Sequence, residues 1–226
     1  MPNWCSQNSV LRGPKDSIAR FCETLNSTLD KPDVRPNGFG KFWLGNLCVA
    51  FGYDYDTLNE AGARLRGNFD PNPNVPACMI HPDPEEKRIV PETVDEKTSS
   101  IGFSIVSAWG QSDWWNDMIA EKFPDCEYAW KARDEFGNFH ECHNLHLLGV
   151  SSYEIEQYGE PWVEMGFNRG EEEAAAAFVN RLTRKRKDRV TPEDFLKGED
   201  AVISKLLEYN DKHEDNEIVV RVWEEV

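Results

Sequence analysis

The stretch from Ile101 to Leu148 reads IGFSIVSAWGQSDWWNDMIAEKFPDCEYAWKARDEFGNFHECHNLHLL, and it decides the fold. Ile101, Phe103 and Ile105, with the apolar residues that follow, are typical of a mostly buried strand, because β-branched and aromatic side chains fit a packed, pleated surface. Gly110 ends this apolar run. We therefore predict a buried strand at the beginning of the stretch.

A helix is predicted next, over residues 113–123. Ser112 can cap its first turn, and Pro124 follows its end. The residues expected to face the core recur at helical spacing and are Trp115, Ile119 and Phe123. The pattern is that of an amphipathic helix.

A hairpin is predicted after this helix. From Cys126 the apolar residues alternate with charged ones, so that Tyr128 and Trp130 share one face and Trp130 is expected to be buried. Gly137 allows a turn into a second strand, predicted over residues 139–148.

Further along the chain the same alternation of element types continues. Residues 149–170 are predicted to be irregular, a helix begins near Glu171, another begins at Thr191, and residues 217–224 alternate as a strand. From Ile101 the order is strand, helix, strand, strand, helix, strand. This order predicts an α+β fold, a ferredoxin-like split βαβ sandwich over residues 100–226, with an antiparallel sheet and helices on one face.

Residues 1–99 are predicted to form a largely helical amino-terminal part. It begins with a short strand over residues 3–11, interpreted as an edge or terminal strand. Six prolines in residues 67–100 forbid a continuous helix or a central strand, so this segment is interpreted as a linker between the two parts. A lid or a partner-binding arm are the alternatives. The predicted helices are residues 14–27, 42–51 and 55–65.

The charge of the chain restricts its partners. The 226 residues carry a formal net charge of -16, with a pI near 4.7. An acidic surface repels phosphate backbones and anionic lipid, so we expect no direct nucleic-acid binding and no membrane binding. It permits a basic protein partner, and the simpler interpretation is that the charge only keeps the protein in solution. Residues 1–12 lack a basic region followed by an apolar run, and no window is apolar enough to cross a bilayer, so a cytoplasmic location is expected.

No metal or other cofactor is expected. The six cysteines are widely spaced without a C-x-x-C pair, which is typical of reduced thiols rather than of a disulfide framework or a metal cluster. Four possible ligands lie close together in sequence, but on one strand His140 and His146 would be roughly 20 Å apart and His143 would face the other way. His140 and Cys142 would need a further ligand such as His81. The six cysteines are Cys5, Cys22, Cys48, Cys78, Cys126 and Cys142.

Two short motifs resemble a known family. The opening MPNWCS (residues 1–6), and SAW (residues 107–109) followed by Trp115 and by EKFPD (residues 121–125), are similar to the YubB-like family of plasmid- and phage-borne bacterial proteins with a ferredoxin-like domain. The resemblance covers well under half of the chain. It implies an origin on a mobile element and no established activity, so it supports the fold and leaves the function open.

The candidate binding residues are three tryptophans around the Gly110 turn. Trp109 and Trp115 are expected in the core, and Trp114 is the one expected to be exposed. The chain contains none of the G-x-S-x-G, G-x-x-x-x-G-K or H-E-x-x-H motifs, so no catalytic residue is nominated. The basic run over residues 184–187 is interpreted as a solvated helix end.

The sequence thus favours a non-enzymatic accessory protein of a mobile element, of unknown activity, that binds a protein through its acidic surface. The alternative is a hydrolase-like enzyme whose site is built from scattered residues near the proline-rich segment.

Overall fold

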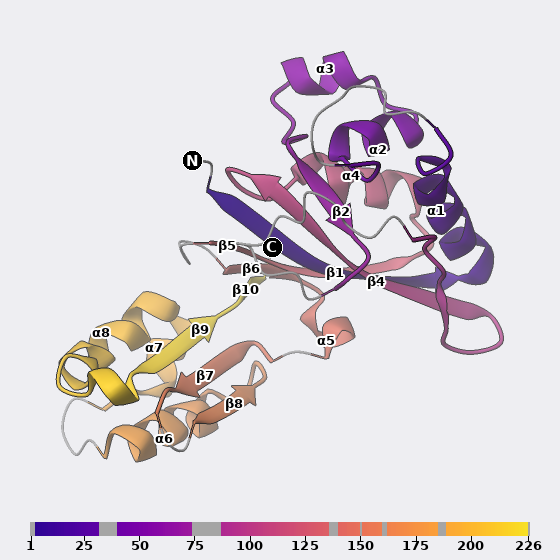
Figure 1. The fold of residues 1–226 in the computed structure, drawn as a ribbon. Coiled ribbons are helices and arrows are strands. Elements are labelled where there is room, and N and C mark those ends of the chain that lie inside the picture. Colours follow the sequence, from indigo (N-terminus) through magenta and orange to yellow (C-terminus); the bar gives the residue numbers. More distant parts are fainter. Residues whose placement is uncertain are drawn as a thin grey trace. The chain divides into compact units, whose positions relative to one another are not determined.

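The computed structural model divides into two compact units, Met1–Asn144 and Leu145–Val226 (Figure 1). The predicted boundary at residues 99 and 100 is therefore not where the chain divides. The reason is that the strand beginning at Thr98 pairs along its whole length with the amino-terminal strand. The structure describes residues 3–31, 40–73, 87–135, 140–149, 151–159, 162–184 and 189–225.

The first unit is an antiparallel sheet with helices packed on it. Its sheet order is β6-β5-β1-β4-β2, and β3 pairs with a further part of β4. The elements in chain order are β1 (Trp4–Pro14), α1 (Lys15–Ser27), α2 (Leu44–Ala50), α3 (Tyr55–Glu60), β2 (Gly67–Asp70), β3 (Glu92–Thr93), β4 (Thr98–Ala108), α4 (Asp113–Lys122), β5 (Glu127–Asp134) and β6 (His140–His143).

The amino-terminal strand is central, and its interpretation as an edge strand was wrong. β1 pairs with β4 from Trp4 to Pro14 and with β5 from Cys5 to Arg12. Some of its polar side chains bond across the sheet, which satisfies hydrogen-bonding groups that are costly to bury unpaired. For example, Ser104 Oγ donates to Asn8 Oδ1 at 3.0 Å.

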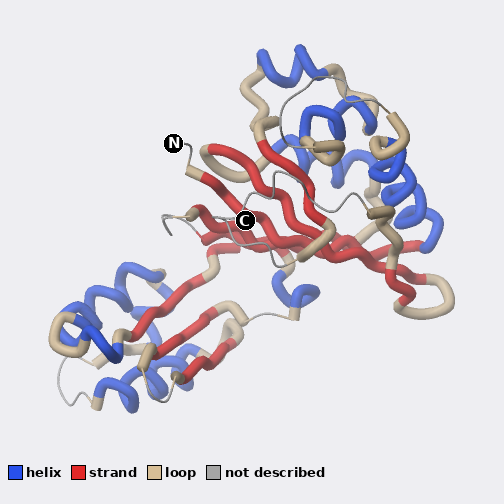
Figure 2. The backbone as a smooth tube through the Cα atoms, viewed as in Figure 1, coloured by secondary structure: helices blue, strands red, loops and turns tan. Residues whose placement is uncertain are grey.

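Helices α1, α2 and α4 cover one face of this sheet, as Figure 2 shows. The alternation along β4 directs Ile101, Phe103 and Ile105 toward them, and all three side chains are buried. Trp115 of α4 and Phe21 of α1 pack against Phe103 from the helical side, with ring centroids 5.9 and 5.7 Å away. The buried strand and the amphipathic helix predicted from residues 101–123 are confirmed.

Two segments of the first unit differ from expectation. The described parts of residues 67–100 do not form a linker between halves, because β2 and β3 both pair with β4. The strand predicted to reach residue 148 ends at His143. Asn144 takes a left-handed backbone conformation (φ 52°) and donates from Nδ2 to Tyr128 O at 3.0 Å, which stops the strand.

The second unit has its own sheet. Three antiparallel strands lie in the order β8-β7-β9, and the buried side chains of β7 and β9 pack against α6, α7 and α8. The elements are α5 (Leu145–Leu148), β7 (Tyr153–Gln157), β8 (Val163–Phe167), α6 (Glu172–Thr183), α7 (Pro192–Leu196), α8 (Glu199–Asn210), the 3₁₀ turn η1 (Glu214–Asn216), β9 (Ile218–Val222) and β10 (Glu224–Glu225).

The predicted carboxy-terminal strand is present with the predicted faces. Ile218, Val220 and Val222 are buried, and the side chains between them are half-buried. However, β9 pairs with β7 and not with β4, so residues 100–226 do not form one sheet. The observed fold is α+β with antiparallel sheets, and the predicted single split βαβ sandwich is not the arrangement of its strands.

The second unit also contains features that the pattern did not predict. Residues 149–170 are not irregular throughout, since they contain the hairpin of β7 and β8. The helix predicted from Thr191 is two helices, because Gly198 has a left-handed φ of 105° between α7 and α8. Thr191 nevertheless caps α7 as predicted, through a capping box with Asp194. In the described ranges no helix is both long and apolar enough to cross a bilayer.

Candidate functional site

The Trp109 side chain is the exposed aromatic group of the predicted trio. It lies just after the end of β4, and 59% of its surface is accessible to solvent. Its backbone has a left-handed φ of 63°, which is uncommon for a bulky residue. The Trp109 N–H donates to Asn3 O at 2.6 Å, and Ser107 Oγ donates to Gly110 O at 2.6 Å. These two bonds hold the turn that directs the ring outward.

Arg66 completes a surface that we call the Trp109 patch, formed by Trp4, Arg66 and Trp109. The Arg66 guanidinium carbon lies 5.3 Å from the Trp109 ring centroid and 6.0 Å from the Trp4 ring centroid. The Arg66 backbone is positioned by a bond from Ala108 N to Arg66 O at 2.9 Å. At Gly67 an added Cβ would lie only 1.9 Å from Val106 O, so the chain can pair this closely beside Arg66 only with glycine there.

The other two tryptophans are core residues. Trp115 is fully buried, as expected, but Trp114 is only 7% exposed, so the assignment of Trp114 to the surface and of Trp109 to the core was wrong. Trp114 is covered by the ring of Tyr53, 6.2 Å away between centroids. Tyr53 lies 61 residues earlier in the chain, so the helical pattern around Trp114 could not reveal its cover.

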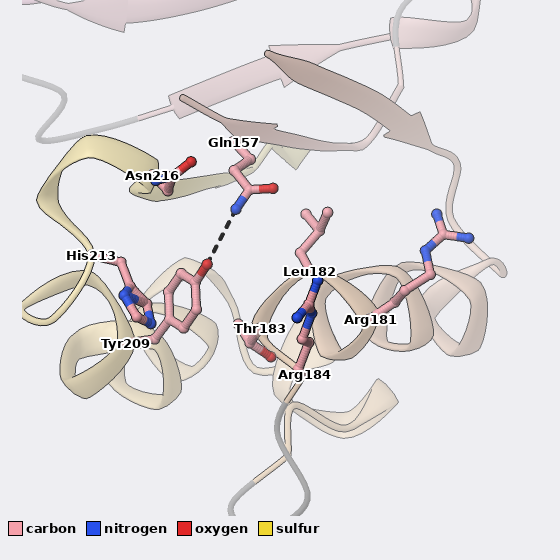
Figure 3. Close-up of a pocket in the computed structure, with 8 residues that line it drawn as sticks. All are labelled: Gln157, Arg181, Leu182, Thr183, Arg184, Tyr209, His213 and Asn216. Carbon is pink, nitrogen blue, oxygen red and sulfur yellow. Dashed lines mark hydrogen bonds between the residues drawn. The ribbon is translucent and has the colours of Figure 1, made fainter. Parts of the chain in front are cut away.

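A second candidate site is a pocket of about 440 Å³ in the second unit (Figure 3). It lies where α6 and α8 end, beside the last residue of β7. No motif in the sequence pointed to it, because its residues come from four separate segments. The residues lining it are Gln157, Arg181, Leu182, Thr183, Arg184, Tyr209, His213 and Asn216.

Several pocket side chains are fixed by contacts to one another. Gln157 Nε2 donates to the Tyr209 hydroxyl at 3.2 Å, as Figure 3 shows, and the Tyr209 ring meets the His213 ring edge-on at 4.4 Å between centroids. Thr183 Oγ1 donates back to Val179 O within α6. Arg184 follows α6 with a left-handed φ of 52° and is exposed.

The possible metal ligands around residue 140 do not converge. Cys142 is buried opposite Lys131, while His143 lies on the other side of the strand, 6.4 Å from the Trp130 ring. His146 is on α5, not on the same strand, and is exposed. The His140 side chain and His81 lie outside the described residues. Among those that are described, no three His, Cys, Asp or Glu side chains are grouped so as to hold a metal ion.

Four of the described cysteines are poor nucleophiles. Burial, with a smaller contribution from Asp134, raises the pKa of the Cys5 thiol to about 12. Burial also raises the pKa of Cys22, Cys48 and Cys126 to about 11. A thiol with such a pKa carries almost no thiolate at neutral pH, and the thiolate is the reactive form. These cysteines therefore act as small apolar side chains.

A buried polar network in the first unit was also missed by the sequence analysis. Gln7 Nε2 donates to the Tyr128 hydroxyl at 2.7 Å and to Asn116 Oδ1 at 2.8 Å. Burial raises the pKa of Tyr128, which keeps its hydroxyl protonated as a donor. The network joins β1, β5 and α4, and its bonds are directed at one another, so it stabilises the sheet rather than forming an open site.

No protein-family model matches this sequence, and comparison with characterised proteins and with solved structures likewise gives no match.

Proposed function

We propose that this protein acts by binding another protein and that the Trp109 patch is the centre of its contact surface. The observation that carries the proposal is the 59% exposure of the Trp109 ring. Tryptophan and arginine are the residue types that most often dominate the binding energy of an interface. In the patch both types are side by side.

The conformation of Trp109 adds to this argument. A left-handed backbone at a bulky residue costs about 1–3 kcal/mol and is kept where the surrounding structure requires it. At Trp109 this cost is not offset by burial of the apolar ring, because the residue has a φ of 63° and its side chain is exposed to solvent. Such strain is typical of sites whose purpose is contact with something outside the chain.

The charge of the chain supports a basic partner. With a net charge of -16, the protein attracts basic protein surfaces and repels nucleic acid. The resemblance to YubB-like proteins implies an origin on a mobile element, and for a protein carried by such an element we propose a cytoplasmic, non-enzymatic role. The attraction would increase the association rate, while the aromatic patch would supply the affinity.

The test is affinity capture from a bacterial lysate with matched variants. Trp162, which is 57% exposed in the second unit, gives the control. We expect Trp109→Ala to lose a partner that both wild type and Trp162→Ala retain. Equal capture by all three proteins would contradict the proposal.

Salt dependence tests the electrostatic part separately. Raising the salt from about 0.05 M to about 0.5 M shortens the Debye length from roughly 14 Å to 4 Å, so association with the captured partner should slow by at least about tenfold. Surface plasmon resonance measures this rate. An association rate that does not change over this salt range would eliminate charge complementarity and leave the Trp109 patch alone as the explanation of binding.

The alternative of an enzyme near the proline-rich segment has no specific observation in its favour. In the described flanks of that segment, the Asp70 carboxylate accepts a bond from Asn72 N at 2.8 Å, which is a turn contact. Arg88 pairs with Asp30 on the surface, with both side chains more than 60% exposed. Neither arrangement provides a general acid or base beside a cavity.

A further inference from the structure

The pocket of the second unit concentrates positive charge in an acidic chain. Arg181, Arg184 and His213 line it, and none of its described lining residues is acidic. Along the sequence, residues 181–189 contain six of the 25 lysines and arginines of a chain whose net charge is -16. The charge requires an explanation.

The ordinary explanation is that basic side chains complement the ends of helices. α6 and α8 both end at this pocket, and each helix end corresponds to roughly half a negative charge, or about one negative charge together. The guanidinium groups of Arg181 and Arg184 carry two positive charges, because arginine is always protonated in proteins. About one positive charge therefore remains after both helix ends are neutralised, before His213 is counted.

The ion pairs of the described residues show which carboxylates contact these two guanidinium groups. Among the described residues, no ion pair is formed by Arg181 or Arg184, and the Arg181 guanidinium rests 5.0 Å from the ring centroid of Phe178 on its own helix. By contrast, Arg221 of the same unit pairs with Glu156 at 2.5 Å. The Arg184 guanidinium is thus available to a ligand, and Arg181, whose guanidinium lies over the Phe178 ring, adds a second positive charge beside the cavity.

We infer that this pocket binds the phosphate group of a small phosphorylated molecule. The planar guanidinium group matches phosphate oxygens in a bidentate manner, and such charge-assisted bonds are the strong ones. The volume of about 440 Å³ exceeds the needs of phosphate alone and falls in the range of about 300–1,000 Å³ that is usual for small-molecule sites. Most of the pocket lining is polar, so the rest of such a molecule would meet hydrogen-bonding groups such as Gln157 and Asn216, and Leu182 would supply a smaller apolar part.

Calorimetric titration of the full chain tests this inference. The probes are inorganic phosphate, adenosine monophosphate, adenosine without phosphate, and a 12-nucleotide single strand without terminal phosphates. We expect phosphate and the monophosphate to bind and adenosine not to bind. Arg184→Asn should weaken binding at least tenfold, since it removes the guanidinium while asparagine tolerates the left-handed backbone at this position.

Arg169→Gln is the matched control, because it makes the same change of charge at an exposed position of this unit outside the pocket. It should bind as wild type does. Arg181→Gln should weaken binding as well, and it replaces Arg184→Asn if circular dichroism shows the latter to be unfolded. The inference is overturned if wild type binds neither phosphate nor the monophosphate, if Arg169→Gln loses as much affinity as the pocket variants, or if only the oligonucleotide binds.

Discussion

The core of Met1–Asn144 is built around aromatic rings, whereas that of Leu145–Val226 is mainly aliphatic. In the first unit the Trp115 ring alone lies within 6.2 Å, between centroids, of five other rings, those of Phe21, Phe51, Phe69, Phe103 and Trp114. In the second unit the buried cluster consists mostly of alanine, valine, leucine and isoleucine, with Tyr153, Phe178 and Phe195. All six cysteines also belong to the first unit.

The two units therefore rely on different side chains for their stability. The first depends on a few large side chains and on thiols kept neutral by burial. Both units nevertheless share one type of contact. In it, an asparagine side chain bonds to the backbone N–H and to the backbone C=O of a single apolar residue further along the chain. The pairs are Asn26 with Ile89, Asn180 with Val190, and Asn210 with Ile218.

The largest expected effect is selective loss of the first unit at alkaline pH. Four of its thiols, those of Cys5, Cys22, Cys48 and Cys126, have pKa values raised from 9.0 to about 11 or 12. The stability they contribute is fully present below pH 9 and is lost as the pH rises through these values. In the second unit, burial and then the bond to Glu172 raise the pKa of Tyr153 from 10.0 to about 12. Ionisation of Tyr153 therefore lowers the stability of that unit only above pH 10.

Urea unfolding at pH 8, 9.5 and 10.5 measures this difference. Tryptophan fluorescence reports chiefly the first unit, which holds six of the eight tryptophans, and pulse proteolysis with mass spectrometry reports the second. The midpoint of the first unit should fall first. Equal shifts of both midpoints would show that buried thiols do not distinguish the units.

The next effect in size is that of Trp115→Ala. Removing a large buried ring costs about 3–5 kcal/mol, and loss of its ring–ring contacts adds to this. Trp109→Ala is the control of the same residue type in the same unit. It should cost no more than about 1 kcal/mol, because it gives up an exposed cation–π contact. Chemical unfolding measures both, and similar costs would mean that the Trp109 ring is not on the surface.

The smallest of these effects concerns the asparagine contacts. Asn180→Ala should destabilise the second unit by about 1–3 kcal/mol, because it leaves both backbone groups of the buried Val190 unpaired. Asn26→Ala should cost the first unit less, since Asn26 is only half-buried. Asn180→Asp keeps the oxygen that accepts from Val190 N, so its free energy of unfolding should lie between those of wild type and Asn180→Ala. If Asn180→Ala cost under about 0.5 kcal/mol in urea unfolding, water would be replacing both bonds.

The candidate site could be predicted only in part. The sequence pointed to the tryptophans at the Gly110 turn, but it exchanged the exposures of Trp109 and Trp114. Periodicity places a residue on a face of a helix, whereas exposure depends on what covers that face, here Tyr53. The pocket of the second unit had no local signal at all, since Gln157, Arg184 and Tyr209 meet only after folding.

Side-chain spacing was enough to predict the local elements that have strong periodicity. The buried strand before Gly110, the helix after Ser112, the burial of Trp130 and the two faces of β9 all follow from side-chain spacing, and all are present. These features depend on neighbours within one element, so the information needed to predict them is contiguous.

The pairing of these elements could not be predicted from side-chain spacing. β1 became a central strand, β2 and β3 joined β4 from within a proline-rich segment, and β9 paired with β7 instead of β4. The physical reason is that a strand's periodicity specifies its faces but not its neighbour along the hydrogen-bonding direction. The choice of neighbour depends on contacts between residues far apart in the chain, such as Asn8 with Ser104. It also depends on single backbone positions such as Asn144, which ends β6 and is the last residue of the first unit.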